Sequence, residues 1–413
     1  MIQEAAGKIK GNARACLITE PFFTIPHTMY TGYMTLYMIE LGMTKSQVGM
    51  VSSLGLAAHL VFAVISSYVI DKMGRRTVTL IFDVIGWSMA QVVWAIARDI
   101  RYFVAAALIN AFGRIVMNSF HCLMLEDSPM ESRIYIFNFM QVAGLIAGFF
   151  APLSAFLIRR YTLVPAMRGF FWFGTIFMTG MFFIRHLYLR ETTVGKQKMR
   201  ETRDVGVMEA IRTYIPVMRR IRKNRILLLA LALRTLNFIQ LTTRNTFLSV
   251  LVTERWGFPA GSMAIFQTVN AFVMLFVLLL VSPALANYTR RWPVVIGLAF
   301  HIAATGILLF APAGASLPLL VLCSVLIAMG TSIATPYIEA LSANAIDNED
   351  RSLINAVASV ILLSISSPFG YIGGVLSTID TRLPFVMTLT IFAICLFLLR
   401  AIDTLSVKQE AAR

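Results

Sequence analysis

Apolar residues in this chain are gathered into blocks of roughly 20 or more, and this feature restricts the fold more than any other. A helix rises 1.5 Å per residue, so ~20 residues cross the ~30 Å hydrocarbon core of a bilayer. Lipid offers the backbone no hydrogen-bond partners, so each block must be helical. The sequence therefore predicts an all-α membrane protein with about twelve transmembrane helices. We expect the spans at residues 15–41, 47–70, 77–97, 102–125, 134–158, 163–188, 226–253, 261–286, 292–313, 317–343, 353–378 and 383–402.

Composition excludes a water-soluble chain. Charged residues make up only 14% of the sequence and hydrophobic residues 58%, whereas a soluble protein carries about a quarter charged residues. The four cysteines fall inside predicted helices without metal-ligand spacing, so we expect neither a metal site nor a cofactor. The sequence shows no nucleophile–base constellation and no Walker loop, so we expect neither an enzyme nor an ATP-driven pump.

The net charge of +15 reports topology rather than nucleic-acid binding. With both termini placed in the cytoplasm, 25 of the 36 lysines and arginines lie in cytoplasmic segments and 8 in outer segments. This positive-inside asymmetry predicts a multi-pass protein of the plasma membrane with both termini cytoplasmic. Membrane lipid is then an expected partner and nucleic acid is not, and anionic headgroups are expected near the basic central loop.

One long polar segment separates two sets of six spans. We expect a six-helix bundle over residues 1–188, a cytoplasmic basic loop over 189–224 and a second six-helix bundle over 225–413. A shift of about 215 residues, slightly more near the fifth span, aligns the halves. The aligned pairs are 41–43 with 256–258, 75–76 with 290–291, 131–133 with 349–351, and Pro152 with Pro368. Parallel six-helix repeats with a binding site between them are a known transporter plan.

Within the central loop, residues 207–222 have apolar residues near helical spacing and a basic face. This pattern fits either a helix lying along the membrane or a solvated linker with a short helix.

A short motif stands between the second and third spans, where residues 67–76 read Ser-Tyr-Val-Ile-Asp-Lys-Met-Gly-Arg-Arg. It resembles the signature loop of the major facilitator superfamily, Gly-x-x-x-Asp-(Arg/Lys)-x-Gly-(Arg/Lys)-(Arg/Lys), with Ser67 in place of the first glycine. The six-plus-six layout, the basic central loop and a degenerate second copy at residues 282–291, with Ala286 replacing the aspartate, extend the resemblance over nearly the whole chain. The resemblance implies the two-bundle fold of that superfamily and a secondary transporter.

The resemblance also implies a latch between the two halves in the outward-facing state, formed by Asp71 and an arginine. The glycine of the motif allows a tight turn, and its two arginines hold the loop on the cytoplasmic side. The acidic partner is expected at one of two residues that end the fourth span. The alternative is that these charges only set the topology. The gating candidates are Asp71, Gly74, Arg75, Arg76, Glu126 and Asp127.

Charged side chains inside spans cost ~2.5–3.5 kcal/mol each on insertion scales, so each suggests a function or a specific partner. In the superfamily that this chain resembles, the first, fourth, seventh and tenth helices line the central cavity, and most of these side chains fall on the corresponding spans. Polar residues at three- and four-residue spacing form stripes there. The substrate-cavity candidates are His27, Tyr30, Arg114, Asn118, His121, Asn237, Arg244 and Asn245.

These residues each have a second interpretation. Arg114 and Arg244 keep their protons, so each needs an anion, which is either the substrate or a protein carboxylate. Packing is the alternative for the histidines and Tyr30. A carboxylate in a low-dielectric site can carry a proton reversibly, with an ordinary salt bridge as the alternative. The proton-coupling candidates are Glu20, Glu339 and Asp83.

The sequence favours a monomeric secondary transporter that moves a small polar or anionic solute by alternating access, coupled to protons. The arginines favour an anion over the main alternative, a proton-coupled multidrug efflux antiporter. Residues 147–155 match the signature of such antiporters only weakly. A transport-dead membrane receptor is the alternative from another class, and a channel is disfavoured because a pore does not need duplicated halves.

Overall fold

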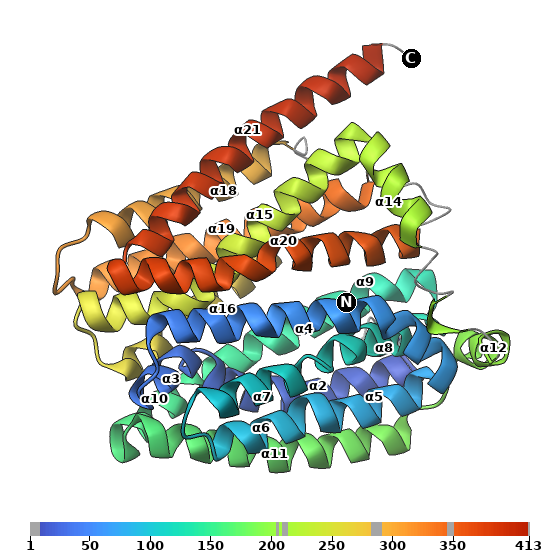
Figure 1. Cartoon of the computed structure of the whole chain (residues 1–413), viewed down its shortest axis with the longest axis horizontal. Coiled ribbons are helices and arrows are strands. Elements are labelled where there is room, and N and C mark those ends of the chain that lie inside the picture. Colours follow the sequence, from blue (N-terminus) through green and yellow to red (C-terminus); the bar gives the residue numbers. More distant parts are fainter. Residues whose placement is uncertain (1–8, 204–205, 209–213, 282–290, 345–350, 412–413) are drawn as a thin grey trace. The chain divides into compact units, whose positions relative to one another are not determined.

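The computed structural model describes residues 9–203, 206–208, 214–281, 291–344 and 351–411. Every element that these residues form is a helix, and the chain divides into two compact units (Figure 1). The first unit holds residues 1–41 and 54–213, and the second holds residues 42–53 and 214–413. The first turns of the second long helix, α4 (Lys45–Met73), therefore group with the second unit.

Short breaks divide several of the expected spans of the first unit. Its elements are α2 (Gly11–Thr31), α3 (Met34–Glu40), most of α4, α5 (Arg75–Asp83), the π-helix η1 (Val84–Met89), α6 (Ala90–Ala95), α7 (Ile100–Asn110), α8 (Gly113–Leu125), α9 (Met130–Ala147), η2 (Gly148–Phe150), α10 (Ala151–Tyr161), α11 (Leu163–Tyr188) and α12 (Thr193–Glu201).

The second unit is built from longer helices. Its elements are α14 (Tyr214–Lys223), α15 (Arg225–Val250), η3 (Leu251–Arg255), η4 (Ala260–Ser262), α16 (Met263–Phe276), η5 (Val277–Val281), α18 (Arg291–Phe310), α19 (Leu317–Asn344), α20 (Arg351–Ile379) and α21 (Leu383–Ala411). Residues 282–290 and 349–350, which belong to the predicted repeat, lie outside the described residues, as do residues 209–213 of the predicted amphipathic segment.

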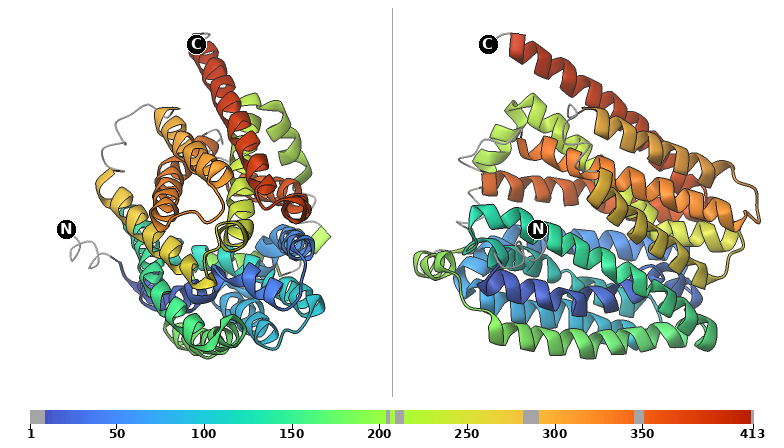
Figure 2. Two further views of the ribbon diagram at one scale, coloured as in Figure 1. Left: turned by 90° about the vertical axis from the view of Figure 1, so that its left-hand side faces the viewer. Right: turned by 180° about the vertical axis from the view of Figure 1, so that it is seen from behind.

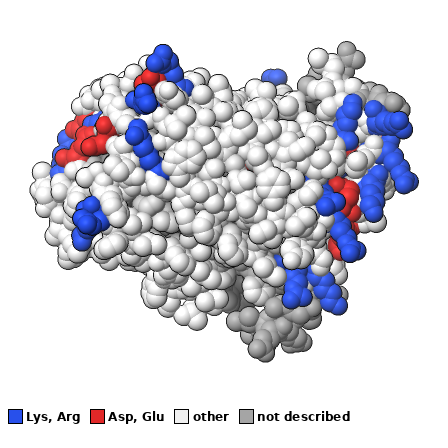
Figure 3. Space-filling model, turned by 90° about the horizontal axis from the view of Figure 1, so that it is seen from below, with Lys and Arg blue, Asp and Glu red and all other residues white. Residues whose placement is uncertain are grey.

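Eleven stretches of the described chain are long and apolar enough to cross a membrane. This confirms the predicted all-α membrane protein. Of the twelve expected spans, the first, which contains α2, is not among the eleven. It carries Glu20 and two prolines, Pro21 and Pro26. On the face shown in Figure 3, charged side chains gather at two ends and leave an uncharged band between them.

The core of the first unit positions α2, which packs between α9 and α11 (Figure 2). Ala13 and Cys16 of α2 are buried against Leu123 of α8 and Ile136 of α9. The corresponding core of the second unit joins α15, α18, α19 and α21 through Leu233, Leu298, Ile338 and Phe392, among others. Each unit therefore buries its own apolar core.

The third and fourth spans cross at a close contact in the first unit. An ideal Cβ on Gly86 of η1 would lie 2.7 Å from the backbone nitrogen of Gly113, so only glycine fits there. The Asn110 side chain donates to the Gly86 carbonyl at 2.9 Å, at the break between α7 and α8. Single turns of π-helix such as η1 are frequent at functional sites, and this one directly follows Asp83.

Two interhelical loops carry the same Asp-x-Arg cap. Asp99 accepts the backbone N–H of Arg101 at 2.9 Å, and Asp380 accepts that of Arg382 at 2.8 Å. In each loop the arginine side chain also pairs with the same carboxylate. Hydrogen bonds from Arg382 lower the pKa of Asp380 to about 2.

Candidate functional site

The signature loop is held together by a buried arginine. Gly74 links α4 to α5 with a φ of 85°, a conformation that favours glycine. Arg75, only 4% exposed, pairs with Asp71 at 2.9 Å and with Glu126, the residue after α8, at 3.2 Å. The structure thus places Glu126, rather than Asp127, on the arginine of the motif.

A carboxylate from the central loop also binds to the signature loop. Glu191 accepts the backbone N–H groups of Arg75 at 3.0 Å and of Arg76 at 2.9 Å, the first two N–H groups of α5. A negative charge is favourable there because the first N–H groups of a helix lack partners within it. An ideal Cβ on Gly74 would lie 2.6 Å from the Glu191 carboxylate, a second reason for glycine at that position.

Hydrogen bonds join the start of α12 to the end of the fourth span. The Thr192 hydroxyl donates to Glu126, and Thr193 donates through its hydroxyl and its backbone N–H to Asp127. Neither Glu191 nor Thr192 was predicted from the sequence to belong to the site. The one local signal was an acidic residue followed by two threonines directly after a basic helix end, a pattern typical of a helix start.

A second charged cluster lies inside the first unit. Asp83 at the end of α5 forms an ion pair with Arg185 of α11, and their side chains are only 3% and 5% exposed. The Arg185 guanidinium also faces the rings of Phe120 at 4.9 Å and Phe182 at 5.4 Å. Asp83 is therefore neutralised by a cation from another span.

Glu20 of α2 lies within electrostatic range of this pair. Its carboxylate makes no hydrogen bond or ion pair with the part of the chain that the structure describes. The third candidate carboxylate, Glu339 of α19, pairs with Arg234 of α15 at 2.8 Å. Among the three proton-coupling candidates, Glu20 alone lacks a direct partner within the described residues.

The polar stripe on α2 lies among aromatic rings. His27 stacks on Phe23 at 5.6 Å and meets Trp87 and Tyr30 edge-on. Tyr30 is 2% exposed and packs against Phe171 at 5.0 Å. The structure therefore places Tyr30 inside the helix bundle of the first unit.

The candidates on α8 lie beside α4. Arg114, in the first turn of α8, is within electrostatic range of His59 and His121. The Asn118 side chain donates to the Ser66 hydroxyl at 2.8 Å. These contacts join the polar stripe of the fourth span to the second span.

The candidates of the second unit centre on Arg244 of α15, which is 8% exposed. Its guanidinium lies 3.4 Å from His301 of α18 and donates to Thr331 of α19 at 3.3 Å. One turn earlier, Gln240 donates to Asn237 at 3.1 Å. Asn245 is exposed.

Arg244 borders a small cavity that lies wholly within the second unit. Its volume is about 10 Å³, roughly the space of one water molecule. Its walls include Gln240, His301, Phe385 and Phe392. Over the described chain, no three His, Cys, Asp or Glu side chains are grouped so that they could hold a metal ion.

Comparison with known protein families agrees with the resemblance carried by the signature loop. The sequence matches the family model of the Major Facilitator Superfamily over residues 22–251 and 233–412. The chain belongs to the major facilitator superfamily. A search of curated proteins found no match.

Solved structures of this superfamily share the fold at low sequence identity. A mutant of the nucleoside transporter NupG has a TM-score of 0.72 and 14% identity, covering 95% of this chain and 99% of that one. A POT family transporter in complex with a thioalcohol-conjugated peptide has a TM-score of 0.71 and 12% identity, covering 98% and 99%. The human organic anion transporter MFSD10 (TETRAN) has a TM-score of 0.60 and 16% identity, covering 96% and 99%.

The superfamily and these neighbours are all transporters rather than enzymes. Together with the eleven apolar helices, they identify the chain as a multi-pass membrane protein and a secondary transporter.

Proposed function

We propose that the protein moves a small polar or anionic solute across the plasma membrane by alternating access, coupled to protons. The observation that carries the choice of an anion is Arg244. This guanidinium is buried, its contacts are His301 and Thr331, and no described carboxylate pairs with it. An arginine keeps its proton, and a buried charge without a counter-charge is costly, so a bound anion would stabilise this site.

Arg114 supports the same proposal from the first unit. It lies on the fourth span, as Arg244 lies on the seventh, and both spans line the cavity in this superfamily. It lies within electrostatic range of His59 and His121, and the alternative role for Arg114 is to neutralise a protein carboxylate. The neighbours described as nucleoside, peptide and organic anion transporters act on polar solutes, which is consistent with a polar substrate here.

Glu20 is the proposed proton carrier. Asp83 and Glu339 are held in ion pairs with Arg185 and Arg234, which stabilise their charged forms. Glu20 has no such direct partner and lies near Arg185, so protonation of Glu20 would change the charge balance around that pair. We propose that Glu20 takes up and releases the coupled proton.

A ligand screen tests the substrate class. The detergent-solubilised protein is heated with adenosine, dialanine, lactate, glutamate, phosphate or tetraphenylphosphonium. A ligand at a hundredfold excess over its Kd stabilises the folded state by ~2.7 kcal/mol, which raises the midpoint temperature of thermal unfolding. A rise with an anion or a polar solute supports the proposal, whereas a rise with tetraphenylphosphonium alone would support the multidrug antiporter.

Variants then test the two residues with the solute that the screen identifies. Arg244→Lys keeps the charge but loses the planar fork, so apparent affinity should fall about ten- to a hundredfold, or ~1.5–3 kcal/mol. Arg159→Gln, an exposed arginine of α10, is the control and should transport normally. In proteoliposomes, Glu20→Gln should abolish uptake driven by a pH gradient but retain solute exchange. Unchanged gradient-driven uptake by Glu20→Gln would exclude Glu20 as the proton carrier. If the unmodified protein bound a solute but gave no flux, it would be a receptor.

A further inference from the structure

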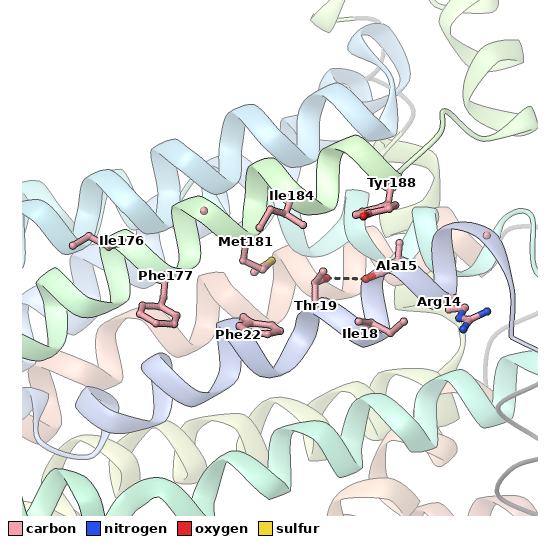
Figure 4. Close-up of a pocket in the computed structure, with 12 residues that line it drawn as sticks. Arg14, Ala15, Ile18, Thr19, Phe22, Ile176, Phe177, Met181, Ile184 and Tyr188 are labelled. Atoms are coloured by element: carbon pink, nitrogen blue, oxygen red, sulfur yellow. Dashed lines mark hydrogen bonds between the residues drawn. The ribbon is translucent and has the colours of Figure 1, made fainter.

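Two apolar grooves run along opposite sides of α2 in the first unit. The groove against α11 has a volume of about 780 Å³ and is lined by Ile18, Phe22, Phe177, Gly180 and Ile184, among others (Figure 4). The groove against α9 has a volume of about 540 Å³, and its walls include Leu17, Pro21, Phe139 and Ile146. Both volumes lie within the ~300–1,000 Å³ range of small-ligand sites.

Arg14 lines both grooves, and among their lining residues it alone is charged. It lies in the first turn of α2 and is exposed, and its side chain has no ion pair with any described residue. In Figure 4 it lies at one end of the row of lining residues, beyond Ile18 and Ala15. A single cation thus lies at the shared end of two apolar grooves.

Further positive potential surrounds Arg14. The Asn12 side chain donates to the backbone carbonyl of Arg190 at 2.8 Å and accepts its backbone N–H at 2.8 Å, which fixes Arg190 beside the start of α2. Lys10, the residue before α2, is exposed and provides no side-chain cap. The first N–H groups of a helix lack partners within it, and this adds to the attraction for an anion.

The length of the groove against α11 matches one leaflet. From Gly11 to Phe22, α2 rises about 16 Å at 1.5 Å per residue, and half of a ~30 Å hydrocarbon core is ~15 Å. A third groove farther along α2, of about 620 Å³ and lined by Met29, Leu153 and Gly169 among others, has no charged lining residue. The basic end is therefore specific to the leaflet that holds the start of α2, which the lysine and arginine distribution assigns to the cytoplasm.

We propose that one anionic phospholipid of the cytoplasmic leaflet binds astride α2, with its phosphate on Arg14 and one acyl chain in each of the two grooves. The paired grooves suit the two chains of a phospholipid, and the basic end suits a headgroup with net negative charge. Basic pockets between helices on the cytoplasmic side are known to bind such headgroups. This proposal depends on neither the transported solute nor the coupling ion.

Native mass spectrometry of the full chain in detergent tests the proposal. Phosphatidylglycerol and phosphatidylcholine with identical acyl chains are added separately, and bound lipid is counted. One phosphatidylglycerol should bind in preference to phosphatidylcholine. Arg14→Gln should weaken its binding about fivefold, the effect of ~1 kcal/mol per basic residue. Gly180→Leu should weaken the binding of both lipids, because a Cβ on Gly180 meets nothing within 4 Å and the new side chain fills the groove without disturbing the fold.

Two matched controls separate the site from general effects. Arg200→Gln removes an exposed basic charge of α12 that lines neither groove, and Gly169→Leu fills the uncharged third groove. Both should bind phosphatidylglycerol like the unmodified protein. Equal binding of the two lipids, or unchanged binding in Arg14→Gln, would overturn the proposal. Displacement of the lipid by inorganic phosphate, with Gly180→Leu unaffected, would assign Arg14 to a free anion. If the mass spectra showed a complex of two protein molecules, and Gly180→Leu abolished this complex, the groove would be assigned to a second copy of the protein.

Discussion

The buried ion pair between Asp83 and Arg185 gives a prediction whose magnitude follows from the structure. Both side chains are at most 5% exposed, so Arg185→Met leaves a carboxylate buried without its counter-charge. Breaking a buried pair from one side costs about 3–5 kcal/mol. The contacts of Arg185 with two aromatic rings add ~0.5–2 kcal/mol to the loss. We therefore expect Arg185→Met to destabilise the first unit strongly.

The thermal midpoint in detergent, followed by tryptophan fluorescence, measures this loss. At roughly 2–4 °C per kcal/mol for a unit of this size, the combined loss of ~3.5–7 kcal/mol corresponds to a fall of about 7–28 °C. Replacing a buried pair by apolar residues is often neutral or stabilising by ~1–4 kcal/mol. The double variant Asp83→Leu/Arg185→Met should therefore recover most of the midpoint that Arg185→Met alone loses.

An exposed pair provides the matched control. Arg101 pairs with Asp99 at 2.8 Å, but its side chain is 86% exposed, so Arg101→Met should leave the midpoint almost unchanged. The reasoning would be refuted if Arg185→Met melted within about 2 °C of the unmodified protein, less than one kcal/mol at this size. It would also be refuted if the double variant were no more stable than Arg185→Met.

Three other predictions concern the signature loop and the topology. Asp71→Asn removes the charge that pairs with Arg75 at 2.9 Å within the first unit and that is expected to latch the two halves. It should slow transport while leaving insertion intact, and wild-type flux in this variant would leave the expected latch without support. Glu191→Gln loses the charge that caps α5 and should cost about 0.5–2 kcal/mol, seen as a lower midpoint, and an unchanged midpoint would show that the cap is unimportant. With native cysteines removed, Arg200→Cys should resist a membrane-impermeant thiol reagent in intact cells and react after lysis, whereas rapid labelling of intact cells would place the central loop outside.

The sequence was sufficient for the membrane class and the superfamily. The length and apolarity of a span are properties of consecutive residues, so eleven of the expected spans were recognisable without tertiary information. The signature at residues 67–76 is also local, and its match to the superfamily was confirmed. The interruption at Ala111 and Phe112 was not predicted, because it coincides with the close approach of Gly86 to Gly113, and that contact joins two different spans.

Tertiary structure alone decided which charges have partners. Asp83 and Glu20 were both proton-coupling candidates in the sequence. Arg185, 102 positions from Asp83, pairs directly with Asp83 and not with Glu20. Glu191 reaches across 116 positions to the backbone of Arg75. Such pairings depend on how each helix is rotated about its axis and on the depth at which it packs. The sequence by itself determined that these charges lie in or beside apolar spans, and the packing of the helices determined which of them are neutralised.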